Sequence, residues 1–324
     1  MPDPTAPARS DLIVGIGKVT RSDGTTNLIM QDESEFSIQL LETLGPVSIG
    51  GQVVDQRWIE YKAQLQFNTD GRLSAAALAQ FWNNVANYLP GQSLAGQPAA
   101  PATDVNTVVT GNDGETHTMY NSIITGLPSL RLHPERGAMG PATITGIIGN
   151  SKNWVDASAF YAVGSGGTFT DASWVTSDPL RQQYSAAYGA ITGLTDFQMQ
   201  DGWTIDFNLR MHMLPVQGIT RDIKFLGLEV MARGIPAKPT VANLLAELQV
   251  PTASAGLTGR SLYSGAQSLI ITGADGVAHV TIPKARLYTG RFAFSGQALR
   301  TGEIAFYSCR NYTAGAQQAL YTIA

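Results

Sequence analysis

Two long stretches of the chain alternate apolar and polar residues with a period of two. The first is IEYKAQLQF at 59–67, and the second is WTIDFNLRMHM at 203–213. Successive side chains of a strand point to opposite faces, so this alternation predicts strands that are buried on one face only. The two stretches therefore predict one long strand in each half of the chain.

Helical periodicity follows each of these regions. DGRLSAAALAQFWNNVANYL at 70–89 has Ser74 as the expected N-cap. Four apolar residues of this stretch share one helical stripe: Leu78, Phe81, Trp82 and Val85. In the second half, Pro239 and Thr240 precede the shorter stretch VANLLAEL. We therefore expect one helix in each half.

One phrase occurs twice. VVTGNDGETHT at 108–118 is answered by IITGADGVAHV at 270–280, with Thr, Gly, Asp, Gly and His recurring at five of eleven positions. Chance alone gives less than about one identity in such a window. GNDG and GADG lie between extended runs, so each predicts a hairpin turn in which Gly supplies a positive φ.

Further matches flank the repeated phrase in the same order. They are GKVT at 17–20 with GAIT at 189–192, MQD at 30–32 and 199–201, PV at 46–47 and 215–216, RWIEYKAQLQF at 57–67 with RDIKFLGLEVM at 221–231, GQSL at 91–94 with GRSL at 259–262, and AFYAV at 159–163 with ALYTIA at 319–324. Diverged copies with loop insertions produce such a series. The sequence predicts a tandem duplication.

The duplication predicts a mainly β protein of two homologous modules. Residues 1–10 form an N-terminal arm, and 11–163 form the first module. Residues 164–185 are a Gly-rich connector, and 186–324 form the second module. Each module is expected to be a β-sandwich or barrel with one flanking helix.

Composition points to surfaces that neighbours cover. Charged residues are 14% of the chain, against about 25% in an ordinary soluble protein, while Gly numbers 34 and the net charge is −4. This balance does not favour a duplex-binding face, which needs clustered Lys and Arg. Cys309 is the single cysteine, which fits a reducing compartment. No apolar run approaches the roughly 18 residues of a membrane helix, so no membrane association is expected.

No motif predicts catalysis, a metal or a cofactor, and we do not expect an enzyme. GIGK at 15–18 lacks phosphate-loop spacing, and DESE at 32–35 is typical of a solvated edge. Cys309 lies in a strand-like run and is expected to be packed rather than reactive. A structural or interface role is expected for the repeat-equivalent turn residues, which are Asp113, Gly114, His117, Asp275, Gly276 and His279.

The first module resembles the major tail tube proteins of long-tailed, siphovirus-type bacteriophages. The resemblance rests on GPVSIGGQ, RWIEYKAQLQF, YLPGQSLAG, GNDGETHTMYNSIITGLPSLRL and GPATITGIIGN, within residues 11–163. It implies a structural virion protein whose β-sandwich strands join those of neighbours into a barrel around the DNA channel. Chains with two tube domains would form trimeric, pseudo-sixfold rings that stack into the tube.

The resemblance also implies a location and partners. The protein would lie in the virion tail after assembly in the host bacterial cytoplasm. It would contact its own copies and the tape measure, terminator and baseplate proteins, and DNA would pass without specific binding. An acidic channel would repel the phosphate backbone, and Glu60, Asp206 and Glu229 are the candidate lumen acids. The arm at residues 1–12 and the loop at 95–104 are candidates for ring-to-ring contacts.

Two other classes remain open. A baseplate or distal-tail ring protein would share the fold but form one finite ring. A duplicated β-sandwich decoration or carbohydrate-binding module would be a monomer or small oligomer. This module would carry an exposed aromatic patch, with Trp154 or Trp174 as candidate members.

Overall fold

The computed structural model describes the chain in segments, and within them the chain is mainly β. The described residues are 18–22, 28–29, 37–68, 75–86, 88, 90–91, 94, 105–111, 114–120, 122–133, 136–139, 141–147, 161–167, 182–189, 202–216, 219–235, 267–289, 292–295, 298–301, 303–309, 312–313, 316–317 and 319–324. They contain 22 strands and one helix, and the sheets are antiparallel. This arrangement is consistent with the expected β-sandwich class.

Strands from the first half of the chain form two small sheets. One has the order β11-β6-β5-β1-β2, built from Tyr161–Ser165, Glu115–Met119, Thr107–Thr110, Lys18–Arg21 and Leu28–Ile29. The other has the order β3-β4-β10-β7, built from Ser37–Ile49, Gln52–Asn68, Pro141–Ile147 and Ser122–Gly126. Ala63, Leu65 and Phe67 are buried, which confirms the predicted buried face of β4.

The second half forms most of a nine-stranded sheet. Its order is β12-β15-β16-β19-β14-β13-β8-β9, with β22 pairing beside β16. The strands of the second half are Tyr184–Tyr188, Gln267–Gly273, Ala278–Thr289, Ile304–Ser308, Ile219–Gly234, Trp203–Val216 and Thr322–Ile323. The last two places in the order belong to the first half, because β8 is Ser129–His133 and β9 is Arg136–Met139. Two halves of the sequence therefore share one sheet.

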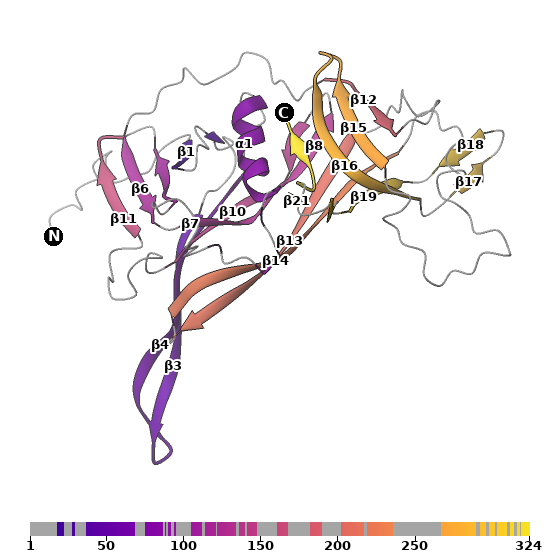
Figure 1. The fold of residues 1–324 in the computed structure, drawn as a ribbon. Helices are drawn as coiled ribbons and strands as arrows, with labels where there is room; N and C mark the ends of the chain where they lie inside the picture. The colour runs from indigo at the N-terminus through magenta and orange to yellow at the C-terminus, as the bar shows by residue number, and fades with distance from the viewer. Residues whose placement is uncertain are drawn as a thin grey trace.

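Each half contains a long antiparallel hairpin, β3–β4 or β13–β14. In β3–β4, Ile49 pairs with Gln52 across the two-residue loop Gly50–Gly51. Both glycines have positive φ, 59° and 81°, as the tightest hairpin loops with the twist of the strands require. The hairpin extends as a long arm away from the rest of the molecule (Figure 1).

Two short hairpins complete the described strands. One consists of β17, Phe292–Ser295, and β18, Ala298–Thr301. The other consists of β20, Tyr312–Thr313, and β21, Ala316–Gln317. Within the described part of the chain, each of these strands pairs only with its hairpin partner.

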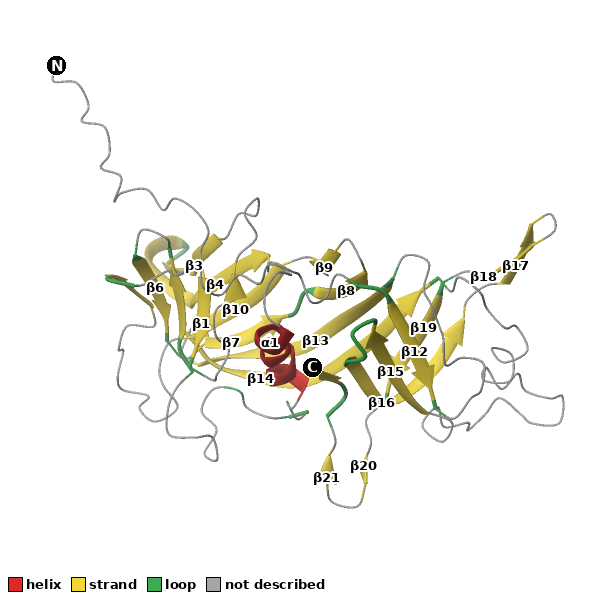
Figure 2. Cartoon of the chain, turned by 90° about the horizontal axis from the view of Figure 1, so that it is seen from above, coloured by secondary structure: helices red, strands yellow, loops and turns green. Residues whose placement is uncertain are grey.

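The single described helix, α1, spans Ala75–Ala86 and packs against the C-terminal strand β22. Phe81, Trp82 and Val85 are fully buried, as their spacing predicts. The side-chain amide of Asn83 donates to the Ile323 carbonyl at 2.7 Å and accepts from the Ile323 amide at 2.9 Å. Figure 2 shows α1 beside the C-terminus. The helix of the first half is thus fixed by a strand of the second.

Buried tyrosine and tryptophan atoms reinforce this contact. The Tyr321 hydroxyl donates to the Trp82 carbonyl at 2.5 Å, and the Trp82 indole donates to the Pro128 carbonyl at 3.2 Å. Burial raises the pKa of Tyr321 well above its usual value, and the nearby Tyr88 adds to the rise. The phenol therefore remains a neutral donor at any ordinary pH.

Three of the expected segments lie outside the described residues, and a fourth, the connector, has strand residues at both ends. The helix predicted after Pro239, the N-terminal arm and the loop at 95–104 lie outside the described residues. Both ends of the expected connector at 164–185 are strand residues, because β11 continues to Ser165 and β12 begins at Tyr184. The amide of Gly167 donates to the Gly114 carbonyl at 2.9 Å. The start of this stretch is therefore attached to the β5–β6 turn.

Candidate functional site

The two hairpins predicted from the repeated phrase are present, and their turns have the same hydrogen bonds. In β5–β6, the Gly111 amide donates to the Glu115 carbonyl at 2.9 Å, and the Gly114 amide donates to the Gly111 carbonyl at 3.1 Å. In β15–β16, Gly273 bonds Val277 at 2.9 Å, and Gly276 bonds Gly273 at 3.0 Å. Gly114 and Gly276 have φ of 86° and 79°. Glycine tolerates this conformation best.

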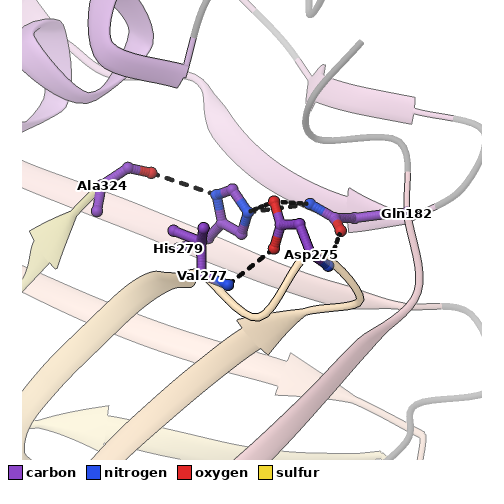
Figure 3. A network of polar contacts seen from close by, with 5 residues as sticks. All are labelled: Gln182, Asp275, Val277, His279 and Ala324. Carbon is purple, nitrogen blue, oxygen red and sulfur yellow. Dashed lines mark hydrogen bonds and ion pairs between the residues drawn. The ribbon is translucent and has the colours of Figure 1, made fainter. Parts of the chain in front are cut away.

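The second turn carries a polar network around His279 (Figure 3). The His279 side chain is 2% exposed, and its Nε2 lies 2.9 Å from Asp275 Oδ2. Gln182 Nε2 donates to the same carboxylate oxygen at 2.9 Å, and the Asp275 amide donates to Gln182 Oε1 at 3.0 Å. On the other side of the ring, Nδ1 lies 3.2 Å from the backbone oxygen of Ala324. The network joins the turn to Ala324, which follows β22, and to Gln182, which lies two residues before β12.

The network holds Asp275 in its charged form. Partial burial of Asp275 opposes ionisation, but hydrogen bonds from Gln182, the Val277 amide and His279, with the nearby His279 charge, outweigh it. The pKa of Asp275 falls to about 2. The Val277 amide donates to Asp275 Oδ1 at 2.9 Å, so the carboxylate also caps its own turn.

The equivalent histidine of the first turn has different partners. His117 Nδ1 lies 2.6 Å from the Tyr161 hydroxyl, and the two rings stack with centroids 6.0 Å apart. His117 Nε2 lies 3.3 Å from Glu115 Oε1, close enough for an ion pair but without hydrogen-bond geometry. Burial and then the Glu115 charge raise the pKa of Tyr161. Asp113 lies outside the described residues.

Sequence reasoning missed the partners of both histidines. Gln182 and Tyr161 come from strands or turns far along the chain, and no local pattern marks them. The equivalence of His117 and His279 was the only sequence signal. In both turns the ring anchors the hairpin to a neighbouring segment, and the role of these residues at an interface stays a prediction.

A second feature is the polar face of the nine-stranded sheet. Along β13, β14 and β19, the side chains of this face alternate with buried ones, such as Trp203, Val230 and Phe306. Two groups of ion pairs lie on it, Arg210 with Glu229, and Arg233 with Asp206 and Glu303. We call this surface the charged face.

Two of the candidate lumen acids lie on the charged face, and each has a basic partner. Asp206 Oδ2 accepts from Arg233 Nε at 2.5 Å, and its Oδ1 accepts from Ser129 at 2.6 Å. Glu229 accepts from Arg210 and, at 3.2 Å, from Asn208. The Glu229 side chain is 58% exposed and that of Asp206 is 27% exposed. The carboxylates are thus offset locally by arginine.

Arg233, at the centre of this face, is held by two acids, Asp206 and Glu303. The Arg233 guanidinium donates to Asp206 and, at 3.0 Å, to Glu303. The hydrogen bond with Asp206 is the largest cause of the raised pKa of Arg233; partial burial opposes this rise, and the charges of both acids support it. The remaining candidate, Glu60, lies opposite Thr43 in β4, and its side chain is outside what the structure describes.

The same sheet also presents an exposed pair of aromatic rings. Tyr288 of β16 and Tyr307 of β19 are 57% and 46% exposed, with ring centroids 6.1 Å apart in an edge-to-face arrangement. Trp154 and Trp174, the aromatic residues considered from the sequence, lie outside the described residues. The sequence did not indicate the tyrosine pair, because its two members are far apart along the chain.

The tip of the β3–β4 arm is apolar and exposed. Its three large aliphatic side chains, all more than half exposed, are Ile49, Val53 and Val54. Exposed aliphatic residues that gather at one end of a projecting element usually mark a contact with another molecule. The arm carries them away from the core in Figure 1.

The remaining candidates carry no site chemistry in the described residues. Burial raises the pKa of the Cys309 thiol, although the nearby Arg286 lowers it, so the thiol form is favoured. In the described part of the chain, no three His, Cys, Asp or Glu residues gather as metal ligands. No described helix is long and apolar enough to cross a bilayer. GIGK at 15–18 and DESE at 32–35 lie outside the described residues, except that the structure includes Lys18 as the start of β1.

Comparisons with known proteins leave the assignment to the chain itself. No family model matches the sequence, and no curated protein matches it.

Proposed function

We propose that this protein is a major tail tube subunit of a long-tailed bacteriophage. Trimeric, pseudo-sixfold rings of the chain stack into a tube, and DNA passes through its channel. The chain has a structural role in the virion tail and performs no catalysis. The proposal rests on the sequence resemblance and on the organisation of the strands.

The observation that carries the proposal is the recurrence of strand neighbours in the two halves. β1 lies beside β5 as β12 lies beside β15, and β11 lies beside β6 as β22 lies beside β16. β4 lies between β3 and β10 as β14 lies between β13 and β19. This recurrence supports a duplicated module, which a trimer needs for pseudo-sixfold symmetry.

Strand register also corrects one of the sequence matches. Thr110 pairs with Lys18, and its counterpart Thr272 pairs with Ser185. By pairing, β1 therefore corresponds to residues at 185–188, whereas the sequence match placed GKVT at 17–20 against GAIT at 189–192. Short matches slip by a few residues when neither copy has a distinctive side chain at that point, as here.

The shared sheet supports assembly through strand addition. Leu130, Arg131 and Leu132 of β8 pair with Ile205, Thr204 and Trp203 of β13, so a first-half hairpin extends the sheet of the second half. A ring of modules needs the same kind of contact between chains. Within one chain, β8 of the first half already extends the sheet of the second half in this way.

The charged face is the surface that would border the channel. It lies on the side of the sheet opposite the core, and its carboxylates alternate with arginines. In the two described groups of ion pairs, each arginine is offset by a carboxylate, which weakens its attraction for the phosphate backbone. DNA would therefore pass this face without being retained.

Electron microscopy of the concentrated, purified protein tests the proposal. End-on class averages with three chains per ring, stacked into hollow tubes, are the expected result. Single rings that never stack would favour a baseplate or distal-tail ring protein instead. A closed small oligomer without a channel would contradict both.

The exposed tyrosine pair favours a second candidate, a duplicated binding module. Neighbouring exposed rings offer a stacking surface for an apolar or sugar ligand. A glycan-binding screen with the wild-type chain and the Tyr288→Ala, Tyr307→Ala double variant tests this candidate. Binding that the double variant loses, in a protein that forms no rings, would favour the module over the tube.

A further inference from the structure

The two long hairpins differ at their outer edges. In the nine-stranded sheet, β13 has β14 on one side and β8 on the other. In the four-stranded sheet, the equivalent strand β3 pairs with β4 alone, within the described part of the chain. The row of paired residues Leu130, Ile205, Ala232 and Phe306 in the nine-stranded sheet has a counterpart in Ile38, Leu65 and Ile144 of the four-stranded sheet. Among the described residues, only the place equivalent to Leu130 has no occupant.

The hairpin that would fill this place is present elsewhere in the chain. β8–β9 follows β7 and precedes β10, and β17–β18 follows β16 and precedes β19 in the same way. Both hairpins have two-residue loops, closed by His133 with Arg136 and by Ser295 with Ala298. β8–β9 adds to β13, whereas β17–β18 pairs only with itself among the described residues.

The vacant edge and the unpaired hairpin lie at opposite ends of one molecule. Figure 2 shows β3 and β4 at one end and β17 and β18 at the other, and Figure 1 agrees. Pairing between the two elements therefore requires a second copy of the chain. A contact between different surfaces of identical chains is head-to-tail, and such contacts generate rings when the rotation closes.

We propose that β17–β18 of one copy pairs with the first residues of β3 in the next copy. β17 then runs antiparallel to β3 and extends the β3-β4-β10-β7 sheet, as β8 extends the other sheet. Leu130 is in the second residue pair of its hairpin and faces Ile205; Ala293 is in the second pair of its hairpin and faces Ile38 of the neighbour. This inference rests on the proposed ring-forming function and names its contact.

Physical chemistry favours this pairing. An edge strand exposes a row of unpaired amide and carbonyl groups, and adding a strand is a common way to satisfy them. Within the chain the same sheet type already binds the same hairpin type, so the geometry is compatible. The contact also covers an edge that would otherwise promote unordered aggregation.

A hairpin deletion gives the first test. Residues 292–301 are replaced by two glycines in the full chain, and thermal unfolding and electron microscopy are compared with wild type. Because β17–β18 pairs with no other described strand, the unfolding midpoint is expected to stay within a few degrees. Rings and tubes are expected to disappear. Three-chain rings from a folded deletion variant would overturn the docking proposal while leaving the tail tube assignment intact.

Cysteine cross-linking gives an independent test of register. In a Cys309→Ser background, Ile38→Cys with Ala293→Cys is expected to give disulfide-linked dimers and trimers under oxidation. Facing positions in adjacent antiparallel strands lie within disulfide reach. Arg131→Cys with Thr204→Cys is the positive control, because these residues pair within one chain and must give a cross-linked monomer. Val53→Cys with Ala293→Cys is the matched control for random collision.

The two tests separate the two proposals. Rings in wild type without a specific cross-link between residues 38 and 293 would overturn the docking contact alone. A specific cross-link in a protein whose particles have no channel would support the docking contact and overturn the tail tube function.

Discussion

At the scale of single residues, two turn glycines and one carboxylate determine the geometry of the β15–β16 hairpin. Gly276 has a φ of 79°, and nothing lies within 4 Å of the position where its Cβ would be. Any cost of a side chain there comes from the backbone conformation and not from collision. The Asp275 carboxylate beside it receives three polar contacts, from Gln182, the Val277 amide and His279.

Gly276→Ala is expected to lower the free energy of unfolding by about 1–2 kcal/mol, because the left-handed region is unfavourable for L-residues with a Cβ. Gly227→Ala is the matched control. Position 227 also has open space around its Cβ and has no positive φ, so that variant should unfold with wild-type stability. Equal losses in both variants, measured by denaturant titration, would contradict the conformational explanation.

Asp275→Asn is expected to be destabilising at neutral pH and to lose its effect in acid. The pKa of Asp275 is about 2 in the folded protein, against 3.8 ordinarily. The stabilisation from the charged form is therefore present above about pH 3.8 and is lost as the pH falls through 2. Solvent reduces its size, because the side chain is 39% exposed.

The measurement is denaturant unfolding of wild type and variant from pH 7 to pH 2. Asp55→Asn, at the exposed end of the β3–β4 arm, controls for the general loss of one surface carboxylate. If the difference in unfolding free energy between wild type and Asp275→Asn stayed constant from pH 7 to pH 2, the stabilisation would not come from the charge of Asp275.

At the scale of elements, the contact between α1 and β22 joins the two halves. Asn83 uses both its donor and its acceptor on one residue, Ile323, as a neighbouring strand would. A helix has no free backbone groups along its side to pair with a strand, so the Asn83 side chain supplies the two hydrogen bonds instead. Both hydrogen bonds to the backbone of Ile323 come from this one side chain.

Asn83→Ala is expected to destabilise the protein by about 1–3 kcal/mol, because it leaves the amide and the carbonyl of Ile323 without partners. Differential scanning calorimetry measures the change. Thr322→Ala alters an exposed side chain of the same strand and should have little effect. A loss in Thr322→Ala as large as that in Asn83→Ala would show that the contact with Asn83 is not special.

Local sequence patterns identified elements but not their partners. The alternation at 59–67 and 203–213 located β4 and β13, and helical spacing selected Phe81, Trp82 and Val85 as buried. The periodicity of a stretch carries no information about which strand lies beside it. The pairing of β8 with β13, and the Gln182 side chain beside His279, depend on residues far apart along the chain and could not be predicted from it.

At the scale of the whole molecule, the tip of the β3–β4 arm carries more exposed large aliphatic side chains than any other described element. Three large aliphatic residues gather there, beyond the reach of the core. In a stack of rings such an arm would contact the ring above or below. The proposal of a tube thus gives the tip a partner.

Val53→Glu with Val54→Glu is expected to leave rings intact and to prevent them from stacking, because burying two carboxylates at an interface is unfavourable. Gln52→Glu places a charge on an exposed polar residue of the same tip and should leave tubes largely unchanged. Tube lengths measured by electron microscopy decide the matter. Wild-type tubes from the double variant would place the stacking contact elsewhere.

The contact between Asn83 and Ile323 also has a consequence in time. These residues are 240 positions apart in the sequence. A ribosome adds roughly 5–20 residues per second, so Asn83 is added to the chain about 12–48 s before Ile323. During that interval α1 lacks its contact with β22, although Trp82 can already reach Pro128 of the first half. The packing around this helix is therefore completed only when β22 has been synthesised.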